Sequence, residues 1–176
     1  MHICKHAHAI TGHSLSRRSF GGIVAAGLAY SIVPAKAAAH AADALVVTCM
    51  DYRLVDDATK FFDGLKLTNR YDQISMAGAT LAATSPKLAS MNAVFWEHIG
   101  LAKQLHGITK VIMVDPRDCG AYRLVLGAAA NIARDAETEL YRKEMVTLKA
   151  DIAKRHPDLG SEFYLMDLNG QAAKIL

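Results

Sequence analysis

The chain has 176 residues, of which 52% are hydrophobic and 21% charged, a composition typical of one globular domain rather than of a disordered or fibrous chain. Its formal net charge of +3 comes from residues 1–37, which contain Lys5, Arg17, Arg18 and Lys36 and no acidic residue. Without these four, 16 basic residues stand against 17 acidic ones. The rest of the chain is therefore close to neutral, and we expect no nucleic-acid partner.

Residues 1–37 have the pattern of an export signal. A polar, basic stretch ends at Arg17-Arg18, and the apolar run over 21–33 that follows is too short to cross a bilayer. The small residues Ala-Lys-Ala at 35–37 are a candidate cleavage site, and the paired arginines are typical of a twin-arginine signal. We predict a cleaved signal over 1–37 and a mature domain over 38–176. The mature protein would be periplasmic, or otherwise exported by this pathway, with no membrane span. The alternative is a membrane-anchoring N-terminus.

The mature region alternates between apolar, β-branched runs and segments with helical spacing of apolar residues. Strands are expected over 44–48, 71–76, 110–114 and 163–166, and helices over 54–62, from 85 to about 102, over 124–130 and over 135–155. Uniformly apolar strands separated by helices indicate a sheet buried on both faces. The predicted fold class is therefore α/β, a three-layer domain with a mostly parallel central sheet.

Two cysteines and an aspartate directly follow predicted strands. Cys49 and Asp51 come after the first strand, and Cys119 comes shortly after the third. In parallel sheets, functional groups gather just beyond the carboxyl ends of the strands, so these side chains should converge. Two thiolates and a carboxylate are good ligands for zinc. In an oxidising compartment, however, Cys49 and Cys119 could instead form a disulfide or remain free thiols.

The two motifs together resemble the β-class carbonic anhydrases. The family has C-x-D-x-R after its first strand, here Cys49 to Arg53, and D-C-G-A after its third, here 118–121. The segments over 74–78 and 107–111 are also similar to the family, and the match spans roughly 45–127.

That resemblance implies an activity and a site. The activity would be reversible hydration of carbon dioxide to bicarbonate, with one Zn²⁺ per chain in a homodimer. The resemblance implies that Cys49 and Cys119 are metal ligands. It implies that Asp51 either binds the metal or controls access to it, and that Arg53 pairs with Asp51 and draws it away from the metal. Asp51 and Arg53 are then the catalytic residues.

The sequence departs from the family at one ligand. The family has a histidine three residues before the second cysteine, and this chain has Pro116, which offers no lone pair. His106 precedes the third strand and is expected at the opposite edge of the sheet, and His98 lies within a helix. Three ligands would remain, Cys49, Asp51 and Cys119. Two alternatives to a carbonic anhydrase thus stay open. One is a catalytically impaired or non-catalytic zinc-binding or scaffold relative, and the other is a thiol or disulfide protein.

Overall fold

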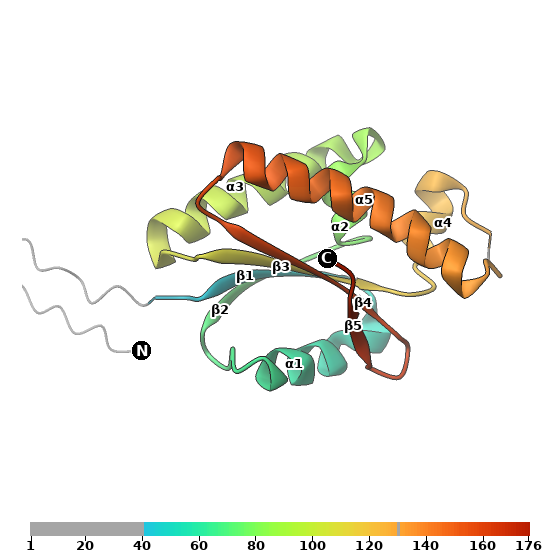
Figure 1. Ribbon diagram of the computed structural model, residues 1–176, viewed down its shortest axis with the longest axis horizontal. Helices are drawn as coiled ribbons and strands as arrows, with labels where there is room; N and C mark the ends of the chain where they lie inside the picture. Colours follow the sequence, from blue (N-terminus) through green and yellow to red (C-terminus); the bar gives the residue numbers. More distant parts are fainter. Residues whose placement is uncertain (1–40, 130) are drawn as a thin grey trace, which may run out of the picture. The chain divides into compact units, whose positions relative to one another are not determined.

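The computed structural model describes residues 41–129 and 131–176 (Figure 1). The predicted export signal lies outside these residues. Within them, no helix combines the length and the apolar character needed to cross a membrane.

The centre of the domain is a five-stranded sheet in the order β2-β1-β3-β4-β5 (Figure 1). Its strands are β1 (Ala44–Cys49), β2 (Tyr71–Met76), β3 (Lys110–Pro116), β4 (Gly160–Met166) and β5 (Ala172–Lys174). The first four strands are parallel, and β5 runs antiparallel to β4. This arrangement confirms the predicted mostly parallel sheet.

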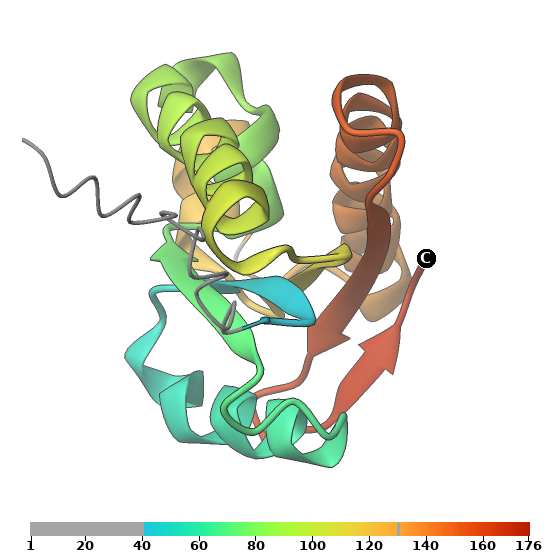
Figure 2. The ribbon, with the colours of Figure 1, turned by 90° about the vertical axis from the view of Figure 1, so that its left-hand side faces the viewer.

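Helices cover both faces of the sheet. They are α1 (Val55–Gly64), α2 (Thr80–Thr84), α3 (Ala89–His106), α4 (Gly120–Leu126) and α5 (Arg134–Arg155), with single 3₁₀ turns at Tyr52–Leu54 and Pro86–Leu88. In Figure 2, α1 lies below the sheet, and α3 and α5 lie above it. The three predicted layers are therefore present.

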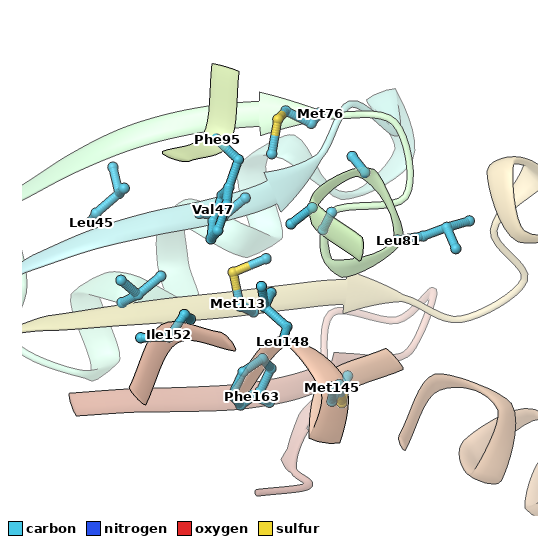
Figure 3. Close-up of a cluster of buried hydrophobic side chains, with 14 of the residues drawn as sticks. Leu45, Val47, Met76, Leu81, Phe95, Met113, Met145, Leu148, Ile152 and Phe163 are labelled. Carbon is cyan, nitrogen blue, oxygen red and sulfur yellow. The ribbon is translucent and has the colours of Figure 1, made fainter. Parts of the chain in front are cut away.

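Successive side chains of a strand point to opposite faces of the sheet, and this divides the core into two clusters. On β3, Val111 and Met113 pack towards α3 and α5, in the cluster drawn in Figure 3, whereas Ile112 and Val114 pack towards α1. All four are at most 3% exposed. A strand buried on both faces has to be apolar throughout, which is why this run has no polar alternation. Asp115, the next residue along, is therefore unusual.

The bounds of several elements differ from the predicted ones. The strand predicted to end at residue 114 continues to Pro116, and the helix predicted over 124–130 is α4, which begins at Gly120 and ends before Gly127. Gly127 has φ +70° and closes α4 in the left-handed conformation that glycine favours. The short elements α2 and β5 were not predicted, because five and three residues are too few to show a periodicity.

Candidate functional site

The two thiols predicted to converge do so at the carboxyl edge of the sheet. Strands β1 and β3 are neighbours, with Thr48 opposite Val114. Cys49 is the last residue of β1, and Cys119 follows β3 by three residues. Their sulfur atoms lie 3.9 Å apart, and neither thiol forms a disulfide.

A separation of 3.9 Å matches one kind of metal geometry. Two thiolates on a tetrahedral zinc, each with a Zn–S bond of about 2.3 Å, place their sulfurs about 3.8 Å apart. A disulfide requires about 2.05 Å. The spacing of the two thiols is therefore compatible with a shared cation, and equally with the hydrogen bond that joins them here.

The surroundings of the pair favour one negative charge on Cys49. The Cys119 thiol donates to Cys49, as do the backbone N–H groups of Gly78 (N to Sγ, 3.3 Å) and Asp51, and together they lower the pKa of Cys49 to about 6 against the effect of burial. The pKa of Cys119 is raised, because its proton is shared with Cys49 and its side chain is buried. The pair thus loses its first proton readily and its second with difficulty.

The Asp51 carboxylate is engaged by Arg53. The Nη2 atom of Arg53 lies 2.6 Å from Asp51 Oδ2, its Nε atom lies 2.9 Å from Oδ1, and the backbone N–H of Arg53 also donates to Oδ1. These bonds lower the pKa of Asp51, and the same pair raises the pKa of Arg53. Arg53 also contacts Asp118, at 3.2 Å. The predicted Asp51–Arg53 pairing is therefore present, and it engages both oxygens of the carboxylate.

The donors around the two sulfurs stop short of a complete zinc site. Among residues 41–129 and 131–176, no group of three or more His, Cys, Asp or Glu side chains is arranged to hold a metal ion. The pair of thiolates fits zinc, but Asp51 would have to leave Arg53 to become the third protein ligand. Neither His98 nor His106 can replace it. His106 Nδ1 is paired with Asp72 at the amino edge of the sheet, and His98 Nδ1 bonds to Val94 of its own helix.

Pro116 is the buried end of β3. The backbone N–H of Arg117 donates to Met166 of β4. Because successive N–H groups of a strand point to opposite sides, the Pro116 nitrogen faces β1. The pairing of β1 with β3 has already ended at Val114. Proline is tolerated there because no ladder hydrogen bond is lost. Its carbonyl accepts a bond of 2.7 Å from the buried hydroxyl of Tyr141.

Small and large cavities flank the thiols. Cys49, Asp51 and Pro116 line a cavity of about 120 Å³ on the α1 side, together with apolar side chains such as Val55. Cys119 lines a larger one, of about 570 Å³, between α4 and α5.

One functional group was not singled out from the sequence. Asp115 is fully buried in β3, where it accepts hydrogen bonds from the backbone and hydroxyl of Thr80 and from Tyr122. Burial, only partly offset by the bonds from Thr80, raises the pKa of Asp115 to about 8. An aspartate directly continuing a wholly apolar strand was the available signal, but it reads equally well as the first residue of a loop.

A buried ion pair, separate from Asp51–Arg53, holds the turn between β3 and α4. Arg117 Nη1 lies 2.8 Å from Glu137, and Arg117 Nε lies 3.2 Å from Asp167. Glu137 also accepts the backbone N–H of Asp118, at 2.7 Å. The turn that carries Cys119 is thereby fixed to α5.

Comparison with known proteins gives relatives in sequence and in structure. No protein-family model matches the sequence. A protein of Rickettsia conorii described as uncharacterized is 28% identical over 134 residues, which cover 76% of this chain and 72% of the relative. An uncharacterized protein of Rickettsia bellii is 29% identical over 134 residues, which cover 76% of this chain and 82% of that one.

Two solved structures are similar to the domain. A mutant form of the β-carbonic anhydrase CafD of Aspergillus fumigatus has a TM-score of 0.47 at 11% identity, over 77% of this chain and 89% of that one. A tetrameric β-carbonic anhydrase of Sordaria macrospora has a TM-score of 0.47 at 12% identity, over 77% and 81%. In structure, this chain therefore resembles β-class carbonic anhydrases of two fungi.

Proposed function

We propose that this protein binds one zinc ion per chain through Cys49 and Cys119, and that its reaction is the reversible hydration of carbon dioxide at a reduced rate. The observation that carries the proposal is the 3.9 Å separation of the two sulfurs, which suits two thiolates on one tetrahedral zinc. The Asp51–Arg53 pair beside them supports it, as does the order of the two motifs along the chain.

Each residue has a distinct part. Cys49 and Cys119 would hold the zinc ion, which would supply Lewis-acid activation of water at neutral pH. Arg53 lowers the pKa of Asp51 and holds its carboxylate aside, so that Asp51 would accept a hydrogen bond from the reacting water. Val55 and Pro116 give the small cavity apolar walls, which suit a neutral substrate.

The low rate follows from Pro116. With two protein ligands instead of three, the metal would be held weakly unless Asp51 leaves Arg53. An Asp51 bound to the metal could no longer accept the hydrogen bond from the reacting water. This conflict favours a second candidate, a zinc-binding relative with no hydration activity that serves as a binding or scaffold module.

Zinc content is the first test. We expect close to one zinc per chain in protein purified after export without chelators, measured by elemental analysis. Cys49→Ser and Cys119→Ser should each abolish it, whereas Cys4→Ser, in the predicted signal, should leave it unchanged. Zinc near zero in the unaltered protein would overturn both candidates.

Restoring the missing ligand separates the two candidates. Pro116→His places an imidazole at the wall that Cys49 and Asp51 share, so zinc should bind at least tenfold more tightly, about 1.4 kcal/mol. Hydration should rise with it, measured by stopped-flow pH change. Pro116→Ala is the matched control and should do neither. If the parent protein is inactive, and Pro116→His binds zinc more tightly but still shows no hydration, the scaffold candidate would be favoured.

The proposal includes export and dimerisation. Replacing Arg17 and Arg18 together by lysine should keep the protein in the cytoplasm. Large apolar side chains flank the site and are exposed, among them Met50 (65%) and Leu124 (88%), and a homodimer would cover them. Analytical ultracentrifugation of the parent protein should give a mass twice that of one chain, and the Leu124→Glu variant should have the mass of a single chain. A monomeric parent would contradict the dimer but not the zinc site.

A further inference from the structure

The two thiols can also react with each other, and this chemistry needs no metal. Their sulfurs are 3.9 Å apart and would have to approach by roughly 1.9 Å to reach the bond length of a disulfide. Side-chain rotation can supply a movement of this size, because both thiols are free and in direct contact. The sheet thus holds two cysteines that are 70 positions apart in the sequence in direct contact.

The turn that carries Cys119 is held from several sides. Asp118, with a backbone φ of +56°, has its carboxylate bound by Arg53 and by Arg123, at 3.2 and 3.1 Å. Its N–H donates to Glu137. Cys119 therefore stays opposite Cys49, and a reaction between the two proceeds at a high effective concentration.

The two sulfurs differ in access. Each cysteine borders a cavity, but Cys119 is only 4% exposed, whereas Cys49 is half-buried. A reagent from solution should therefore meet Cys49 first, and Cys119 should react only with a partner already attached to Cys49.

We propose that Cys49 and Cys119 form a redox-active dithiol that closes to a disulfide by exchange with a small-molecule disulfide such as oxidised glutathione. The Cys49 sulfur gives up its proton and attacks one sulfur of the reagent, which forms a mixed disulfide and releases one glutathione thiol. The Cys119 sulfur then attacks Cys49, loses its own proton and releases the second glutathione thiol. In total the protein loses two protons and two electrons, equivalent to two hydrogen atoms, and the reagent gains them as two glutathione thiols.

A consequence follows for the same site. A disulfide offers no thiolate, so the oxidised pair cannot hold a metal as proposed above. Metal binding and oxidation of the dithiol would then be mutually exclusive. The exchange itself does not depend on zinc binding, and it stands even where the zinc content is zero.

The experiment uses the full chain with Cys4→Ser, so that only the two site thiols can react. The reduced, metal-free protein is incubated with oxidised glutathione and its intact mass is followed, with peptide mapping of the product. We expect the loss of two hydrogen atoms, no retained glutathione, and a peptide cross-link between Cys49 and Cys119. A glutathione adduct that persists on this protein, or no reaction at all, would overturn the proposal.

Two further variants test the order of attack. Cys119→Ser should accumulate one glutathione on Cys49, because the second step is blocked. Cys49→Ser should react at Cys119 at least about tenfold more slowly. Equal or faster reaction at Cys119 would contradict the assignment of Cys49 as the attacking thiol. The protein with both cysteines remains the deciding sample if either variant fails to fold.

Discussion

Arg53 binds both carboxylate oxygens of Asp51, with Nη2 to Oδ2 at 2.6 Å and Nε to Oδ1 at 2.9 Å. Only Tyr52 separates the two residues in the sequence, and the 3₁₀ turn that begins there folds the guanidinium back over the carboxylate. The same guanidinium reaches Asp118, next to Cys119. One side chain therefore links the segments that follow β1 and β3, and it controls the orientation of the aspartate nearest to Cys49.

Arg53→Ala should release Asp51 and raise its pKa towards the ordinary value, measured by NMR titration of the carboxyl carbon. Because the pair lowers the pKa of Asp51, its stabilisation is present above the unfolded pKa of about 3.9 and is lost as the pH falls through the folded pKa. The pair is partly exposed, so the loss at pH 7 should be only about 0.2–1 kcal/mol.

Arg70→Ala is the matched control for that variant. Arg70 forms a similar pair with Asp43 at the other edge of the sheet, so its removal should leave the Asp51 titration unchanged. An Asp51 pKa that does not move in Arg53→Ala would show that the ion pair does not persist in solution.

Asp115→Asn should change how stability depends on pH. The folded protein keeps the Asp115 proton up to about pH 8, whereas the unfolded chain loses it near pH 3.9, so this group makes the fold less stable as pH rises between these values. The slope is at most about 1.4 kcal/mol per pH unit. Asparagine imitates the neutral acid, because its Oδ1 can accept the Thr80 N–H and its Nδ2 can donate to the Thr80 hydroxyl. The difference in unfolding free energy between the variant and the parent, from urea titrations at pH 5 and pH 8, should therefore grow in favour of the variant. A constant difference would mean that Asp115 is ionised throughout.

Gly78→Ala should destabilise the domain by about 1–3 kcal/mol in thermal or urea unfolding. Gly78 has φ +76°, and an added Cβ would lie 3.0 Å from the Cβ of Ala121 and 3.2 Å from that of Leu81. Gly64→Ala is the control, since nothing lies within 4 Å of its Cβ position, and it should be neutral or stabilising by up to about 1 kcal/mol. Similar effects of the two substitutions would show that the turn after β2 can relax.

Tyr141→Phe should cost about 1–3 kcal/mol of stability, because it leaves the buried Pro116 carbonyl without its donor. The hydroxyl bond joins α5 to the end of β3, next to the turn that carries Cys119. Tyr52→Phe, at a side chain that is largely exposed, should change the unfolding free energy by less than about 0.5 kcal/mol. Equal effects would mean that the Pro116 carbonyl finds another partner.

Much of the fold could be predicted because it depends on local patterns. The strands at β1 and β2 and the helix at α5 were predicted within one residue of their ends, since apolar runs and long periodic segments carry a strong signal. The convergence of Cys49 and Cys119 was also predicted, from the rule that reactive groups gather at the carboxyl edge of a parallel sheet. The start of α4 and the end of β3 were not, because both depend on how the turn between them packs against α5.

The sequence by itself determined the composition of the site: two cysteines, one aspartate with its arginine, and a proline where the resembling family has a histidine. These are properties of residue identity and order. Only the tertiary structure decided the distances among them. It placed the sulfurs 3.9 Å apart, brought Arg53 to Asp118, and buried Asp115 between Thr80 and Tyr122. The physical reason is that β1 and β3 are neighbours in space but not in sequence, so only the assembled sheet sets the spacing of the groups that they carry.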